Sequence, residues 1–261
     1  AMIFSDPVKE RIQLNEETFW AGGPHNNNNP NFLEVLPYVQ KLIFEEKEAE
    51  ADSILNMIRP LPNGMPYLTI GSLYLDFPDH KDYTDYKRVL DINSAIQSTQ
   101  YVSNGVTYTR ETFASFTDNV IIMRITADKE KSITFTASYN TPLEKHSVSA
   151  KGEKLILKGI GTDHEGIKGA VRFESQTQIT TTGGKVKAEK DRLTVTDATS
   201  ATIYISIATN YVNYKDISAN ESKRAESYMK SASGKPYQEL LARHIDYYQK
   251  QFRRVELNLG K

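Results

Sequence analysis

The sequence contains no cysteine, which excludes disulfides, thiolate metal sites and cysteine nucleophiles. It also has no apolar run near the roughly 18 residues that a transmembrane helix needs, so we expect no membrane span. Neither sign of charge is in excess, because 32 Lys and Arg stand against 33 Asp and Glu, a formal net charge of −1. Nucleic acids and anionic surfaces are bound by clustered basic residues, so we expect neither a nucleic acid nor a membrane as a partner.

The motifs of several enzyme classes are missing as well. None of the five histidines lies two to four residues from another, so no zinc-ligand spacing exists, and we predict no metal site. No serine stands in a G-x-S-x-G elbow, and neither G-x-G-x-x-G nor a P-loop occurs, so no nucleotide or other cofactor is expected. A glycosidase needs only two carboxylates, and sequence spacing cannot select a pair from 33. We therefore assign no catalytic residue.

Short β-rich segments separated by turn residues fill the middle of the chain, from residue 67 to residue 208. The clearest is a hairpin in which Asn104 and Gly105 join strands at 96–102 and 106–115, because Asn-Gly accepts positive φ at both turn positions. About ten such strands with few helices predict a mostly β fold, a large two-sheet antiparallel β-sandwich, or super-sandwich.

Three segments have the apolar spacing of helices. Residues 34–55 carry it early in the chain, with Pro37 expected in the first turn, where its missing N–H costs little. Residues 221–231 and 235–252 carry it near the end. All three are expected to be packing or linking helices, not catalytic ones.

The end of the sequence predicts one more strand, at 253–259, because apolar and polar residues alternate there. This strand either closes the domain or is followed by further chain. The start, inside an apolar run, also suggests a piece of a longer protein. We predict a sandwich domain over 1–217 and, over 218–261, a helical segment with the closing strand that leads toward a missing catalytic domain.

The segment 11–24, R-I-Q-L-N-E-E-T-F-W-A-G-G-P, is the best candidate for function, and it holds the only tryptophan. An aromatic ring beside amide, carboxylate and imidazole groups is typical of sugar sites, because the ring covers C–H groups and the polar groups take hydroxyls. The candidate substrate-binding residues are Asn15, Glu16, Trp20 and His25.

A structural interpretation of this segment stays open. In it, Phe19 and Trp20 anchor the core, and residues 13–17 form a turn without contact to any ligand.

The same segment resembles the R-I-Q-L-N-E-D-T-L-W-S-G-G-P signature of glycoside hydrolase family 95, the α-L-fucosidases. Residues 71–77 are similar to the family's G-D-L-Y-L-D-F, and residues 86–91 to its Y-x-R-x-L-D. Residues 105–111 resemble its G-V-T-Y-T-R-E, and residues 255–260 resemble the V-x-L-x-L-G that closes its first domain. The matches fall in the family's order over most of the chain.

The resemblance implies an N-terminal sandwich, of a type shared with family 65 phosphorylases, linked by helices to an (α/α)6 barrel. That barrel carries a Glu acid and a water activated by Asn with Asp, and it hydrolyses α-L-fucosides by inversion. The resemblance also implies periplasmic or secreted location. This chain departs from the family at Leu68, Thr69 and Ser72, where Gln, Pro and Asp are usual, so a related L-sugar or galactoside is an alternative substrate.

Two functions from different classes follow. The first is a non-catalytic domain that supports its own catalytic barrel and lines part of the pocket for an oligosaccharide or glycan, with Asn15, Glu16, Trp20 and His25 as wall residues. The second is a stand-alone carbohydrate-binding module. Helices at the end of the sequence favour the first function, because a free module has little use for them. An exposed apolar surface would favour the first function as well.

Overall fold

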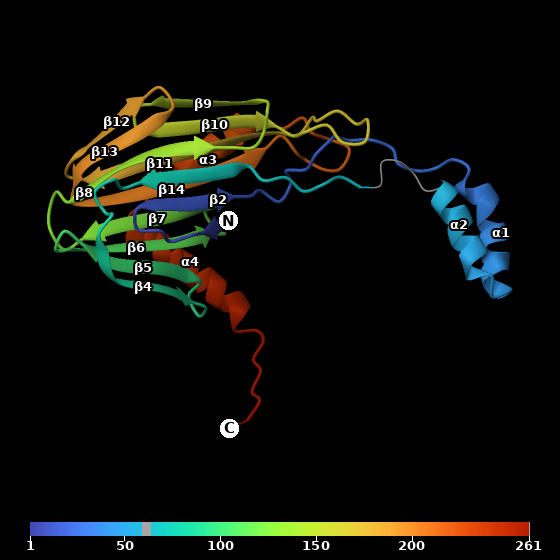
Figure 1. Ribbon diagram of the computed structural model, residues 1–261, viewed down its shortest axis with the longest axis horizontal. Helices are drawn as coiled ribbons and strands as arrows, with labels where there is room; N and C mark the ends of the chain where they lie inside the picture. Colours follow the sequence, from blue (N-terminus) through green and yellow to red (C-terminus); the bar gives the residue numbers. More distant parts are fainter. Residues whose placement is uncertain (59–63, 261) are drawn as a thin grey trace.

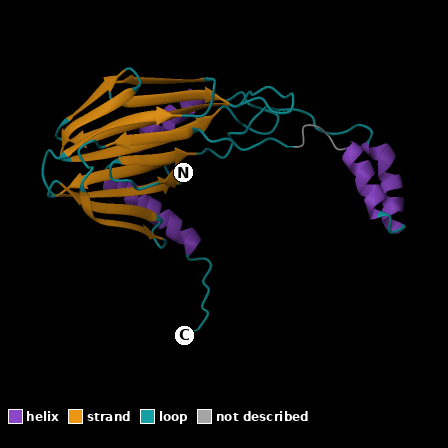
Figure 2. Cartoon of the chain, in the orientation of Figure 1, coloured by secondary structure: helices purple, strands orange, loops and turns teal. Residues whose placement is uncertain are grey.

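Alternating buried and exposed side chains build two antiparallel sheets in the computed structural model, which describes residues 1–58 and 64–260 (Figures 1 and 2). In Lys9–Leu14, for example, Glu10, Ile12 and Leu14 are buried while the residues between them are not. The strands of the described residues are β1 (Met2–Ile3), β2 (Lys9–Leu14), β3 (Gly71–Asp76), β4 (Tyr83–Asp91), β5 (Ile96–Ser103), β6 (Val106–Ser115), β7 (Val120–Ala127), β8 (Ile133–Asn140), β9 (His146–Lys151), β10 (Lys154–Ile160), β11 (Arg172–Thr182), β12 (Lys185–Glu189), β13 (Arg192–Ala198) and β14 (Ser200–Thr209). The helices are α1 (Phe32–Phe44), α2 (Glu48–Ile58), α3 (Glu221–Ser233) and α4 (Tyr237–Phe252).

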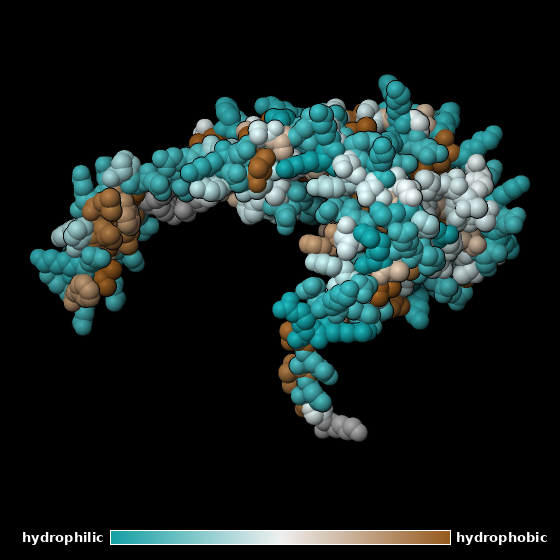
Figure 3. Space-filling model, turned by 180° about the vertical axis from the view of Figure 1, so that it is seen from behind, coloured by the Kyte–Doolittle hydropathy of each residue, from teal (hydrophilic) through white to brown (hydrophobic). Residues whose placement is uncertain are grey.

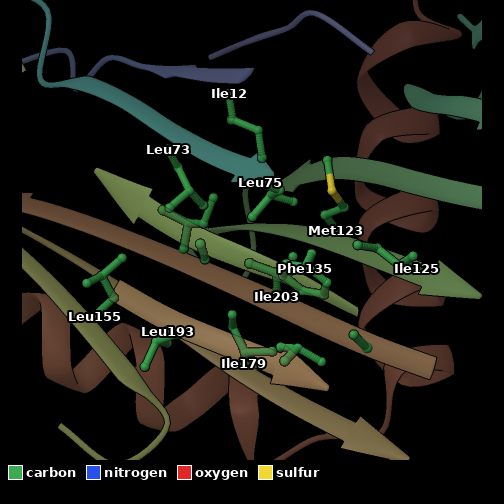
Figure 4. Close-up of a cluster of buried hydrophobic side chains, with 14 of the residues drawn as sticks. Ile12, Leu73, Leu75, Met123, Ile125, Phe135, Leu155, Ile179, Leu193 and Ile203 are labelled. Carbon is green, nitrogen blue, oxygen red and sulfur yellow. The ribbon is translucent and has the colours of Figure 1, made fainter. Parts of the chain in front are cut away.

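The two sheets face each other, as the predicted sandwich requires. One has six strands in the order β1-β2-β3-β8-β13-β12, and the other has eight in the order β4-β5-β6-β7-β14-β11-β10-β9. Fully buried side chains from both sheets, such as Leu73 and Leu75 on one side and Met123, Ile125 and Ile203 on the other, fill the space between them (Figure 4). The sandwich prediction is therefore confirmed.

The hairpin at Asn104 and Gly105 is also confirmed. Both residues have positive φ, at 51° and 66°, and β5 pairs with β6 in the register that this turn sets. Three other strands, β4, β9 and β12, were missed. Each is the last strand at an edge of its sheet, and β4 is exposed along its whole length. Strands β9 and β12 contain no fully buried residue either, so the apolar pattern of these edge strands is weaker than that of a strand inside the sheet.

Helices α3 and α4 cover the outer face of the eight-stranded sheet. Met229 and Leu240 from these helices are fully buried against Ile122 and Tyr204 from the sheet. Strand β14 is consequently buried on both faces, with Ile203 in the core between the sheets. The helices predicted at 221–231 and 235–252 are therefore confirmed to within two residues, while the domain boundary at 217 stays a prediction.

Two predictions for individual elements were wrong. The single helix expected over 34–55 is two helices, because Glu46 has φ of 59° and the Lys47 N–H turns back to the carbonyl of Leu42. Pro37 lies in the second turn of α1, not the first, so the helix lacks one backbone hydrogen bond there.

The closing strand expected at 253–259 does not form either. These residues run past the end of α4 without a partner strand, and Val255 and Leu257 are 83% and 78% exposed. Alternation alone cannot make a strand, because the backbone groups must pair with a neighbour.

The helices α1 and α2 form a hairpin that projects from one end of the sandwich on two long connections (Figures 1 and 2). Its own core is small and consists of Val39, Leu42 and Ala51 with a few half-buried neighbours. Helices of this length are marginal without tertiary packing. Several large side chains nevertheless remain exposed on it: Leu33, Tyr38, Ile43, Phe44 and Met57. Figure 3 shows brown hydrophobic patches on the hairpin.

Candidate functional site

The segment predicted to bind sugar follows β2 and is fixed from two sides at the end of the sandwich. Phe19 is fully buried in the core, as the structural interpretation expected for this residue. The Ala21 N–H donates to the carbonyl of Pro66 at 3.0 Å, and the Gly22 N–H donates to the carbonyl of Thr162 at 2.9 Å. The segment therefore lies between two other loops, which hold its backbone in place.

Two glycines make this close packing possible. Gly22 has φ of 64°, and a Cβ there would lie 2.7 Å from the Met65 Sδ. A Cβ on Gly23 would lie 2.9 Å from the Ala170 Cβ. A larger residue at either position would push the neighbouring loops apart, which explains the Gly-Gly pair in the segment.

Trp20 is not a core anchor, since 43% of it is exposed. Its ring is nevertheless fixed, because Nε1 donates to the carbonyl of Glu17 at 2.8 Å. The ring of Tyr67 packs edge-on against it, with 5.1 Å between ring centroids. Trp20 thus offers a rigid, partly exposed aromatic surface.

Trp20 borders a depression of about 270 Å³, which we name the Trp20 hollow. It is lined by Thr18, Trp20, Ala21, Gly23, Pro24, His25, Asn27, Met65, Val171, Tyr211, Asn213, Tyr214 and Ile217. None of these lining residues is Asp, Glu, Lys or Arg, so the hollow suits an uncharged ligand.

A second depression, of about 500 Å³, lies nearby and is named the Glu16 hollow. It is lined by Asn15, Glu16, Glu17, Ala114, Ser115, Phe116, Asn119, Val120, Ile121, Ile205, Ile207 and Tyr228. The four predicted residues are therefore divided, since Asn15 and Glu16 line one hollow while Trp20 and His25 line the other. They do not form the single site that the sequence suggested.

Glu16 is held by its neighbours. Its carboxylate accepts from the Thr18 N–H at 2.7 Å and from the Thr18 hydroxyl at 2.6 Å. Because that hydroxyl donates to Glu16, it accepts in turn from the Thr209 hydroxyl at 2.5 Å. Burial raises the pKa of the Glu16 carboxyl above its ordinary value, against the effect of the Thr18 hydrogen bonds. These contacts fix the turn that leads from β2 to Trp20.

His25 presents one free ring nitrogen. Its Nδ1 lies 2.8 Å from the carbonyl of Gly23, which can only accept, so Nδ1 carries the proton. In the neutral ring, Nε2 is then an acceptor, and it has no hydrogen-bond partner in the described part of the chain. It is available to a hydroxyl group of a ligand.

The structure adds residues that the sequence reasoning missed. Tyr211, Asn213 and Tyr214 follow β14 and reach the Trp20 hollow from a distant part of the chain. A turn closed by reciprocal hydrogen bonds between Asn213 and Asp216 holds them, at 3.0 and 3.1 Å. The motif Y-V-N-Y directly after a strand is itself an aromatic and amide cluster, so a signal for this part of the site was present.

The positions where the chain departs from the resembled family lie elsewhere. Thr69 and Ser72 line a third depression of about 290 Å³ together with Arg11. The Ser72 hydroxyl accepts from the Arg11 Nε at 3.0 Å. These departures therefore do not alter the lining of either hollow described above.

Neither a cluster of metal-ligating side chains nor a helix able to span a membrane is found in residues 1–58 and 64–260. No group of three or more His, Asp or Glu residues lies together there in a way that could hold a metal ion. Within the same residues, no helix has both the length and the apolar character needed to cross a membrane.

Comparison with known proteins shows that the chain is similar in sequence to curated α-fucosidases. It is 29% identical over 292 residues to α-L-fucosidase 2 of Arabidopsis thaliana, a match that covers 100% of this chain and 34% of that protein. It is 30% identical over 168 residues to "Probable alpha-fucosidase A" of Aspergillus niger, covering 61% of this chain and 21% of that protein. The chain thus spans at most about a third of the length of these relatives.

A solved structure of a bacterial glucoamylase with acarbose has a TM-score of 0.41 at 12% identity, over 72% of this chain and 30% of that one, too weak a likeness to inform function. The decisive match is to the family described as "Glycosyl hydrolase family 65, N-terminal domain", and it covers residues 1–214. The chain therefore belongs to this family, as the N-terminal β-sandwich domain of a fucosidase-like glycoside hydrolase.

Proposed function

We propose that this domain supports a catalytic (α/α)6 barrel in the same polypeptide and contributes one wall of its sugar pocket. The complete enzyme, of the family 95 type, would remove α-L-fucose or a related sugar from glycans by inversion. The proposal includes a periplasmic or secreted location, which is common among polysaccharide-degrading enzymes of this type. It is supported by the two α-fucosidases that the chain resembles, both of which are much longer than this chain.

The proposal rests on large apolar side chains that the described residues of this domain leave exposed. On the α1–α2 hairpin, Phe44 is 87% exposed and Met57 is 74% exposed. In the extended segment after α4, Leu257 and Leu259 are 78% and 88% exposed. Large exposed apolar side chains in one region mark interaction surfaces.

The placement of these surfaces fits one large neighbour. The hairpin projects beyond one end of the sandwich and turns downward, while the segment after α4 runs out below the sandwich, so the two flank one space (Figure 1). Figure 3 shows an open space between them, with brown apolar residues on both arms. A barrel in this space would cover both surfaces and lie beside the end of the sandwich that carries the two hollows.

The same observation weighs against an autonomous binding module. Such a module keeps a polar surface so that it stays soluble alone, whereas this domain exposes leucine, phenylalanine and methionine on a projecting hairpin. Its two final helices also pack along the sheet, with Met229 and Leu240 fully buried, which is the arrangement of a structural linker.

The test compares this 261-residue chain with the full-length enzyme on an aryl α-L-fucoside, with the matching α-L-galactoside as the related substrate. We expect hydrolysis by the full-length enzyme, with the β-anomer of the sugar appearing first in an NMR time course, and no turnover by the 261-residue chain. Turnover by this chain at a rate near that of the full-length enzyme would contradict the proposal. So would a full-length enzyme that hydrolyses neither substrate.

A further inference from the structure

We propose that the Trp20 hollow is itself a binding site for a single 6-deoxyhexose such as L-fucose, which the isolated domain binds without any barrel. The choice of sugar rests on the proposed function, while the site rests on the hollow's own geometry. The inference assigns the binding role to one of the two hollows and adds Tyr214 and Asn213 to the residues that form it.

The first support is a rigid aromatic surface. Trp20 is held by the carbonyl of Glu17 and by the ring of Tyr67, so its ring loses little freedom when a ligand binds. Tyr214, which is 72% exposed, borders the same hollow. Aromatic rings cover the apolar C–H faces of sugars, so two rings at one hollow suit a sugar ligand.

The second support is a set of polar groups with unused capacity. The Nε2 of His25 is a free acceptor, as its tautomer requires. The Asn213 Oδ1 accepts from the Lys215 N–H at 3.0 Å, but its amide N–H groups have no partner in the described part of the chain. Acceptor and donor together match the two roles of a sugar hydroxyl.

The third support is the apolar part of the lining. Ala21 and Val171 are almost fully buried beneath the hollow, and Met65 and Ile217 contribute further apolar surface. A 6-deoxyhexose carries a methyl group where an ordinary hexose carries a hydroxymethyl group. Apolar surface accepts the methyl group, whereas it would leave the hydroxyl without a partner.

Size and charge agree with this ligand. A volume of about 270 Å³ is small for an oligosaccharide and sufficient for one sugar ring. None of the described lining residues is Asp, Glu, Lys or Arg, which favours a neutral sugar over an acidic or phosphorylated one. In the Glu16 hollow, by contrast, two carboxylates line the space and Glu16 is already engaged by Thr18.

The only tryptophan of the chain lies in the proposed site, so its fluorescence reports directly on binding. We expect titration of the 261-residue chain with L-fucose to change the Trp20 emission saturably, with a millimolar dissociation constant, as is usual for so small a ligand. L-Galactose, which differs only by a hydroxyl on C6, should bind about tenfold more weakly or worse.

Two variants locate the site. Tyr214→Ala changes an exposed residue, keeps the Trp20 reporter, and should weaken L-fucose binding about three- to tenfold. Phe116→Ala is the matched control, because Phe116 is 69% exposed and lines the Glu16 hollow, and it should leave the affinity unchanged.

Three results would overturn the inference. The first is the absence of any saturable change in Trp20 emission, confirmed by unchanged NMR signals of the indole N–H. The second is equal affinity for L-galactose, which would remove the deoxy-sugar assignment. The third is loss of binding in Phe116→Ala but not in Tyr214→Ala. The hydrolysis assay of the full-length enzyme is independent of these measurements, so either proposal can fail while the other stands.

Discussion

At the scale of single residues, Arg110 is the centre of a buried polar network inside the sandwich. It is fully buried, lies 3.2 Å from the carboxylate of Glu10, and donates to the hydroxyl of Tyr101 at 2.6 Å. It also donates to the carbonyl of Pro7 at 2.7 Å and stacks over the ring of Phe77 at 4.2 Å. This one side chain therefore ties the start of the chain to the eight-stranded sheet.

The contacts around Arg110 also influence the protonation of His80. The Tyr101 hydroxyl accepts from Arg110 and lies 2.8 Å from the His80 Nδ1, and the hydrogen bond of His80 to the Pro7 backbone fits a ring that carries its proton on Nε2, so that Tyr101 donates to Nδ1. Burial in the first place, and the positive charge of Arg110 in the second, lower the pKa of His80 to about 4.

A pH dependence of stability follows from His80. In the unfolded chain a histidine takes up its proton near pH 6.5, whereas folded His80 does so only near 4, so acid favours the unfolded state across this interval. We expect His80 to lower the free energy of unfolding by about 2 kcal/mol between pH 7 and pH 5. The measurement is urea unfolding at both pH values for the wild type and His80→Gln, in which this part of the loss should vanish. His164→Gln, at a surface turn, is the control and should keep it.

At the scale of elements, the α1–α2 hairpin is separate from the sandwich. Its buried residues, Val39, Leu42 and Ala51, form a cluster of their own and share none of the main core. Six acidic residues against two lysines give residues 32–58 a net charge of −4, so the surface it offers is apolar and acidic together. We interpret the hairpin as a projecting arm whose exposed apolar surface is covered by a neighbouring domain.

Replacing residues 32–58 with a Gly-Ser linker tests this interpretation. We expect the sandwich to keep its free energy of unfolding within about 1 kcal/mol, because no core contact is lost and loop length changes entropy only slowly. Urea unfolding followed by Trp20 fluorescence measures this. Leu240→Ala, which opens a cavity under α4, is the positive control and should cost about 2–5 kcal/mol. A comparable loss in the linker variant would show that the hairpin belongs to the sandwich.

The strands also show which parts of the fold could be predicted from sequence patterns. Strands with one buried face and the Asn104-Gly105 turn were predictable, because periodicity and turn chemistry act over a few residues. The edge strands β4, β9 and β12 were not predicted, although each pairs with the strand next to it in the sequence, because none of them contains a buried residue that would strengthen its apolar pattern. The alternation at 253–259 misled for another reason, since no strand of the described residues pairs with it.

At the scale of the whole molecule, the charge balance of −1 leaves little repulsion between copies, while apolar residues are exposed on two projections. We expect the 261-residue chain to self-associate at high micromolar concentration, because exposed apolar patches attract one another. The double substitution Phe44→Glu and Leu257→Glu should reduce the association measured by analytical ultracentrifugation. Gln100→Glu combined with Gln238→Glu, two exposed polar positions with the same total charge change, should not. A monomeric wild type at these concentrations would contradict the expectation.

The sequence by itself determined the class of fold, the two final helices and the segment around Trp20, because these depend on local periodicity and on motifs within a few residues. Only the tertiary structure decided that Asn15 and Glu16 face a different hollow from Trp20. It also brought Tyr214 to Trp20 across nearly two hundred positions of chain. The reason is physical: side-chain patterns act between near neighbours, whereas a binding site is assembled by the packing of two sheets that join distant segments.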